Sequence, residues 1–175
     1  MALNTNVDEP YKGALGLVRI VLGWIFLWAF LDKMFGLGYT TEEANSWIND
    51  GFGTGPTEGY LAYAVSGPFK WLFDSMADST VVAWLFMVGL LAIGVALILG
   101  IGIRVAGITG ALLMFLMYLS ANIWAEGSHN PIFDDHIVYM ILLVYFALKP
   151  ETGNWVGLGA WWKNNKFVKQ YPVLE

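Results

Sequence analysis

The residues of this sequence that could do acid–base chemistry stand at the ends of apolar segments. Asp134, Asp135 and His136 open one such segment. Asp32 and Lys33 close another. A histidine exchanges protons near neutral pH, especially beside a carboxylate, and a lysine amine can hold a small anion. This combination predicts proton-coupled chemistry, such as the delivery of protons to a quinone that is reduced from a membrane.

Metal and thiol chemistry are not expected. The chain has 2 histidines and no cysteine among its 175 residues. Without cysteine it has no disulfides, thiolate nucleophiles, iron–sulfur clusters or covalent c-type haem, and two histidines are too few for a metal site. No glycine-rich phosphate motif follows a strand, so we expect no cofactor bound by this chain alone. A net charge of −5 argues against a nucleic-acid partner.

The composition places these residues in a lipid bilayer. Hydrophobic residues make up 57% of the chain and charged residues 13%, whereas a soluble domain is about 25% charged. The mean hydropathy is +0.57. A membrane-spanning helix needs about 20 apolar residues. We predict an all-α integral membrane fold, one domain over residues 1–175, with four transmembrane helices at 13–31, 81–99, 105–124 and 133–148.

Lysine and arginine residues orient the predicted bundle, because they favour short cytoplasmic loops. Four crossings place the N-terminal tail, the turn at Arg104 and the lysine-rich tail 149–175 on one side. The opposite side then carries many acids and only two lysines, Lys33 and Lys70. We therefore predict a multi-pass protein of the cell membrane with both termini in the cytoplasm.

The long segment 32–80 is predicted to form an extracytoplasmic helical lid between the first two membrane helices. Residues 41–49 have the composition of a short capped helix. The apolar stretch 60–76 is broken at Gly67-Pro68, which suggests two short helices in the membrane interface. The lid either only covers the end of the bundle or also shapes a substrate site.

In this topology the polar residues meet at the extracytoplasmic end. Asn122 lies near the end of the third helix and Asn130 lies in the turn before the fourth. We predict a site in which His136, Asp135, Asp32 and Lys33 do the chemistry and Asn122, Asn130 and Asp134 help to bind the substrate. In the simpler interpretation, the two aspartates before His136 only cap a helix N-terminus and the histidine is a packing residue.

Arg19 lies about two turns, or roughly 9–10 Å, into the first helix and has two interpretations. A cation at this depth can extend its side chain to the inner interface. Alternatively, it faces the bundle and binds a headgroup, a carboxylate or a quinone carbonyl.

Four stretches of the chain resemble the DoxX/DoxD family of four-helix membrane proteins. They are Arg19–Gly36 (RIVLGWIFLWAFLDKMFG), Gly67–Ala77 (GPFKWLFDSMA), Gly94–Ala106 (GVALILGIGIRVA) and Asn130–Tyr139 (NPIFDDHIVY). The long lid is similar to that of the DoxD type, the large membrane subunit of thiosulfate:quinone oxidoreductase. The resemblance implies oxidation of thiosulfate to tetrathionate outside the cytoplasm, with quinone as electron acceptor and a small DoxA-like subunit as partner. Many relatives carry a glutamate where this chain has Leu90.

Two further functions stay open at this point. The chain could be a non-catalytic accessory or assembly subunit that packs against a larger respiratory membrane complex, since its Trp-rich surfaces and small-residue spacings suit helix contacts equally well. A small transporter or lipid-binding protein is the third hypothesis, suggested by the acidic lid and Arg19.

Overall fold

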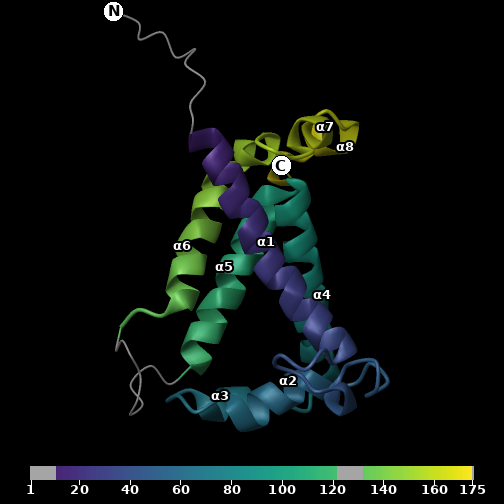
Figure 1. Ribbon diagram of the computed structural model, residues 1–175. Helices are drawn as coiled ribbons and strands as arrows, with labels where there is room; N and C mark the ends of the chain where they lie inside the picture. The colour runs from purple at the N-terminus through teal and green to yellow at the C-terminus, as the bar shows by residue number, and fades with distance from the viewer. Residues whose placement is uncertain (1–10, 122–131, 175) are drawn as a thin grey trace, which may run out of the picture.

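The structure, a computed structural model, describes residues 11–121 and 132–174, and these residues are helical throughout apart from turns and loops (Figure 1). The predicted all-α class is therefore confirmed. Three of the described helices are long and apolar enough to cross a membrane: α1 (Tyr11–Phe35), α4 (Thr80–Leu99) and α5 (Ile103–Ser120). A fourth apolar helix, α6 (Asp135–Leu148), has 14 residues.

The four apolar helices form two pairs. Helix α1 packs along α4, and α5 packs along α6, whereas α4 and α5 touch over a smaller surface. The pairs meet at the end where Gly100 and Gly102 turn the chain, and they separate toward the opposite end (Figure 1). Leu22, Phe26, Leu97, Leu143 and Phe146 lie in the buried core that joins the pairs.

Glycines let the helices of each pair approach closely. A methyl group on Gly94 of α4 would lie 2.7 Å from the backbone nitrogen of Leu27 and 3.0 Å from the carbonyl oxygen of Gly23 on α1. On α5, a methyl group on Gly107 would lie 2.6 Å from the carbonyl oxygen of Leu143 on α6. Within a membrane the hydrophobic effect does not drive helices together, so close backbone packing of this kind stabilises each pair.

Replacing Gly94 with alanine is expected to destabilise the protein by about 1–3 kcal/mol, because the new methyl group must push α1 away from α4. Gly89 lies on the same helix, and a methyl group added there would have nothing within 4 Å, so Gly89→Ala is the matched control. It should be neutral or stabilising by up to about 1 kcal/mol, since alanine is the better helix former. Thermal unfolding in detergent measures both, and equal shifts would contradict the close α1–α4 packing.

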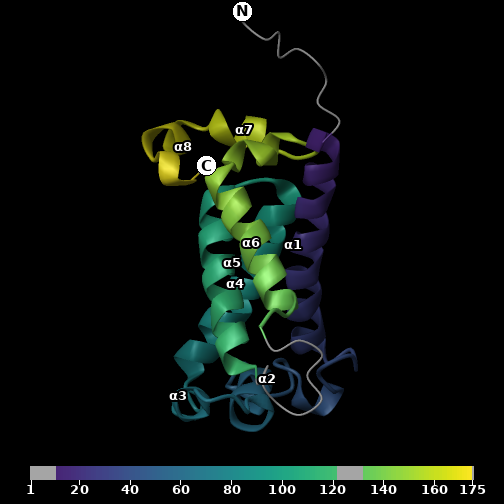
Figure 2. The same cartoon turned by 90° about the vertical axis from the view of Figure 1, so that its left-hand side faces the viewer.

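Residues 36–79, called the end segment below, lie across the end where the two pairs separate (Figures 1 and 2). The segment contains a 3₁₀ turn at Glu43–Asn45, helix α2 (Gly55–Gly59) continued by a π-helical turn η2 (Tyr60–Ala64), and helix α3 (Lys70–Asp74). The helix expected at 41–49 is thus reduced to one turn. The reason is that the backbone reverses so that the Trp47 N–H donates to Lys33 O (2.9 Å).

The C-terminal residues cover the opposite end, beside Gly100. They form the 3₁₀ segment η3 (Pro150–Asn154), helices α7 (Gly159–Lys163) and α8 (Lys166–Gln170), and a 3₁₀ turn η4 (Pro172–Leu174). Backbone contact fixes them there, since Leu158 N–H donates to Leu99 O (2.7 Å). The N-terminus of α1 lies at this same end (Figure 1).

Candidate functional site

Arg19 is completely buried and clamps three segments together. Its guanidinium donates to Leu97 O and, at 3.3 Å, to Ile98 O at the end of α4. It also donates to Trp155 O (3.0 Å) and Val156 O (3.1 Å) in the C-terminal cover. With 0% of its surface exposed, Arg19 has its guanidinium hydrogen-bonded to backbone carbonyls at the Gly100 end of the molecule. Neither interpretation of Arg19 from the sequence included these partners.

The position of Arg19 follows from what the end of α4 requires. The last four carbonyls of a helix have no partner within it. Here the backbone N–H groups of Gly100 and Ile101 donate to Ala96 O. Arg19 donates to the carbonyls of Leu97 and Ile98, and the N–H of Leu158 donates to Leu99 O. A cation also suits the negative end of the helix dipole. Gly100 adopts a left-handed conformation (φ 78°) that allows the chain to turn away there.

Asp32 and Lys33 form a cluster with Thr40 at the opposite end of α1. The Asp32 carboxylate is 1% exposed and accepts from Tyr39 N (3.1 Å), Thr40 N (2.9 Å) and Thr40 Oγ1 (2.6 Å). Lys33 Nζ donates to the same Thr40 Oγ1 (3.3 Å). The carboxylate therefore anchors the first turn of the end segment, and α1 continues to Phe35 rather than ending at residue 31.

Asp134 and His136 form a second cluster at the start of α6. Asp134 is the N-cap: its Oδ1 accepts from Ile137 N at 3.3 Å, while its Oδ2 lies 2.7 Å from Nδ1 of His136. Asp135 Oδ1 lies 3.7 Å from the same nitrogen and its side chain is 68% exposed. The capping expected for these aspartates and a histidine–carboxylate pair are thus both present, and Asp134 rather than Asp135 is the close partner. All three could offer a ligand atom to one cation, since those atoms lie within 4.8 Å of one another.

These two clusters share one end of the molecule but belong to different helix pairs. Figure 1 shows the end of α1 and the start of α6 on opposite sides of the gap. Within residues 11–121 and 132–174, no hydrogen bond or ion pair joins Asp32 or Lys33 to the His136 cluster. Asn122 and Asn130 lie outside the described residues.

A groove between α4 and α5 is a feature that the sequence did not predict. It has a volume of about 810 Å³ and runs from the end segment to the C-terminal cover. Its floor includes Ile93 and Ala106, its walls include Leu85 and Leu112, and it passes Ala92. No Asp, Glu, Lys, Arg or His is among the described residues that line it.

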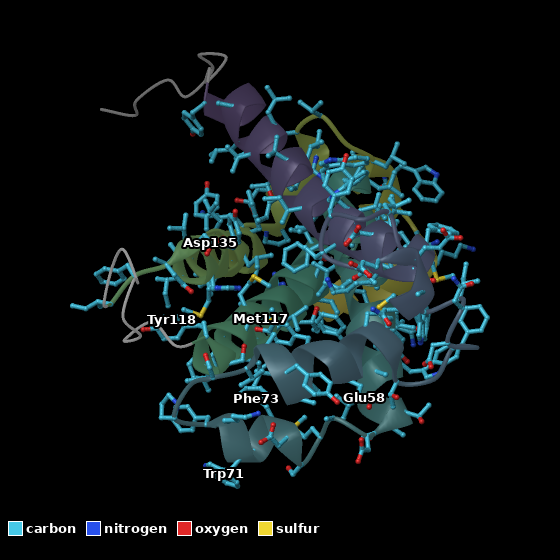
Figure 3. All side chains as sticks on the ribbon, turned by 60° about the horizontal axis from the view of Figure 1, so that its bottom comes forward. Glu58, Trp71, Phe73, Met117, Tyr118 and Asp135 are labelled. Atoms are coloured by element: carbon cyan, nitrogen blue, oxygen red, sulfur yellow. The ribbon has the colours of Figure 1, made fainter. Side chains whose placement is uncertain are left out.

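The polar lining of this groove lies mainly at the end segment. Thr57 and Tyr60 approach from α2 and η2, and Ser120 approaches from the end of α5. In Figure 3, which looks onto this end, the labelled lining residues Phe73 and Met117 lie between Asp135 and Tyr118 on one side and Glu58 on the other. Sequence reasoning missed the groove because it searched for ionisable groups, and hydroxyls on separate segments give no periodic signal.

One family model matches most of the chain, including the helices α4 and α5 that border the groove. Residues 14–123 match the DoxX family model. The chain belongs to the DoxX family. The match includes most of α1, the end segment, α4 and α5, and it contains the described lining of the groove except Trp162 and Leu174, whereas the His136 cluster lies beyond it. Neither the curated proteins nor the solved structures gave a match. With its apolar helices, this DoxX protein is a multi-pass membrane protein.

Proposed function

We propose that this DoxX protein is the quinone-binding membrane subunit of an oxidoreductase that takes electrons from an extracytoplasmic sulfur substrate of the thiosulfate type. The observation that carries the proposal is the α4–α5 groove. It is apolar over nearly its whole lining, it is partly open at the surface of the membrane helices, and its volume suits a ligand that is itself dissolved in lipid. A quinone can enter such a groove sideways from the bilayer.

The proposal includes four membrane crossings with both termini in the cytoplasm. Helix α6 rises about 21 Å over its 14 residues, less than the roughly 30 Å bilayer core, so this crossing uses flanking residues or locally thinned lipid. The lysines of the C-terminal cover then face the cytoplasm. The end segment becomes the extracytoplasmic lid, and the His136 and Asp32 clusters lie on the side where the sulfur substrate arrives.

The reaction balances without a cofactor held by this chain. Two thiosulfate ions each lose one electron and join through a new S–S bond to form tetrathionate, and one quinone takes up those two electrons and two protons to form the quinol. The His136–Asp134 pair would deliver protons from the extracytoplasmic side, with Asp135 beside it. Lys33, together with Asp32, Asn122 and Asn130, would shape the approach of the anion. A DoxA-like small subunit would provide the electron path between the two substrates.

Filling the groove should weaken quinone binding without unfolding the protein. Ala92 is exposed on the groove wall, so Ala92→Phe places a ring where the quinone tail would lie. Ala14 is exposed on α1 outside the groove, and Ala14→Phe is the matched control. We expect at least about tenfold weaker quinone binding for the first variant, equivalent to about 1.4 kcal/mol, and no change for the second. Equal affinities would remove the groove from the proposal.

Reconstitution tests the function as a whole. The full chain is placed in proteoliposomes with quinone, with and without a DoxA-like subunit, and quinone reduction is followed by absorbance after thiosulfate is added. Thiosulfate-dependent reduction that Ala92→Phe lowers supports the proposal. A folded protein that is inactive in both preparations, yet co-purifies with a respiratory complex in mild detergent, would instead establish the accessory role.

A further inference from the structure

The groove has a polar end and an apolar end, and the polar end is built from three hydroxyl groups. Tyr60 Oη lies 2.6 Å from Ser120 Oγ, and Ser120 Oγ in turn donates to Met117 O (2.6 Å). Because the serine proton is used on its own helix, the tyrosine hydroxyl donates to the serine oxygen. The Tyr60 oxygen keeps a lone pair with which it can accept a further hydrogen bond.

Thr57 is the unsatisfied member of this group. The residue is 4% exposed and lines the groove. In the described part of the chain, its Oγ1 has no hydrogen-bond partner. Buried hydroxyls nearly always have a partner, because leaving one unpaired is costly. A ligand atom that accepts a hydrogen bond would remove this cost.

The backbone at this point is unusual as well. The helix changes from α to π geometry between Gly59 and Tyr60, and Val65 N–H closes the wide turn on Tyr60 O (3.2 Å). Turns of π geometry are rare, and they occur frequently at functional sites. This one places Tyr60 beside α5 and leaves Thr57 one turn earlier on the same wall.

The rest of the groove offers no comparable group among the described residues. Thr109 Oγ1 donates to Val105 O on its own helix (2.9 Å). At the far end, Trp162 Nε1 donates to Leu174 O (2.7 Å). The apolar wall from Val82 to Ala96 extends about 21 Å along α4. The lining therefore suits a molecule with one neutral polar head and a long apolar tail, while a phospholipid phosphate would find none of the described charged side chains there.

We propose that the quinone head lies between Thr57 and Tyr60, with the Thr57 hydroxyl donating to a quinone carbonyl and the isoprenoid tail directed toward Trp162. This assignment rests on the proposed function and adds the orientation of the ligand and the residues that select its head. It puts the head at the same end of the bundle as the His136 cluster, which is the end where protons would enter.

The test is a quinone titration of the full chain in phosphatidylcholine nanodiscs, followed by tryptophan fluorescence quenching with decylubiquinone. Thr57→Val removes the hydroxyl at nearly constant volume and should raise the Kd about tenfold, the loss of one buried hydrogen bond. Thr57→Ser should restore affinity. Thr109→Val, whose hydroxyl is already paired, is the matched control and should bind as the unmodified chain does. Tyr60→Phe should weaken binding of the reduced quinol, whose hydroxyl can donate to the Tyr60 oxygen, whereas the exposed neighbour Tyr63 should tolerate the same change.

Competition identifies what the head end recognises. Squalene is a polyprene hydrocarbon without a polar head. Its inhibition constant in competition with quinone should be the same for the unmodified chain and for Thr57→Val. Thr57→Val and Thr109→Val with the same Kd would overturn the orientation, even if Ala92→Phe still blocks binding and so leaves the groove intact. Displacement by phosphatidylglycerol as readily as by unlabelled quinone would overturn the choice of ligand. Failure of the unmodified chain to bind quinone would overturn the proposed function as well.

Discussion

Replacing Arg19 with methionine is expected to destabilise the protein by about 3 kcal/mol or more. Methionine fills most of the same volume but donates no hydrogen bond, so two carbonyls at the end of α4 and two in the C-terminal cover lose their donor while staying buried. Thermal unfolding in detergent should show a midpoint lower by on the order of 10 °C. Arg19→Lys should recover only part of the loss, since an ammonium cannot reproduce the planar fork.

Arg104 provides the matched control for this prediction. It lies in the first turn of α5 at the same end of the molecule, and its buried Nε has no partner in the described residues. A cation is unfavourable near a helix N-terminus, so Arg104→Met should change the midpoint by about 2 °C or less. If the two methionine variants unfold at the same temperature, the clamp around Arg19 does not contribute to stability.

Replacing His136 with glutamine is expected to lower the rate of quinone reduction by about two orders of magnitude or more, the usual contribution of a positioned proton donor. Glutamine keeps a polar side chain beside Asp134 but cannot exchange a proton. Quinone affinity should be unchanged, because His136 does not line the groove. The measurement is kcat against KM in proteoliposomes, with added imidazole as a test of chemical rescue.

Two aspartate variants separate proton delivery from helix capping. Asp134→Asn keeps an acceptor for Ile137 N, because asparagine caps helices as well as aspartate does, but removes the carboxylate from His136. It should lower the rate and preserve the unfolding midpoint. Asp78 is exposed, and Asp78→Asn should have no effect. Full activity of His136→Gln in the folded protein would assign the pair a purely structural role.

The long helices could be predicted from the sequence because apolar runs of that length have few alternatives to burial or lipid. Their ends could not. Hydropathy continues to Trp124, yet α5 ends at Ser120, where the serine hydroxyl turns back to Met117 O and Gly67 of the end segment approaches the last carbonyls. The approach of Gly67 comes from more than fifty positions away in the chain, which a local pattern does not include.

The candidate site was predictable in its location but not in its connections. Topology alone places Asp32 and His136 at one end of the bundle, and the structure has the end of α1 and the start of α6 at that end (Figure 1). It does not indicate which helices pair, and pairing of α1 with α4 and of α5 with α6 keeps the two groups apart. The partners of Arg19 could not be predicted for a related reason, since they are backbone carbonyls from Leu97 and Trp155, and carbonyls have no signature in a sequence.

The two helix pairs are joined at the Gly100 end and diverge from there, so that end can act as a hinge between them. Helix α4 is about 30 Å long, so a tilt of only about 5° around the fastened end moves its other end by roughly 2.6 Å. Displacement is smallest at the Arg19 clamp and largest at the hydroxyls of the end segment. The mouth of the groove can therefore widen while the Arg19 clamp stays intact, at the expense of the Tyr60–Ser120 hydrogen bond that joins the end segment to α5.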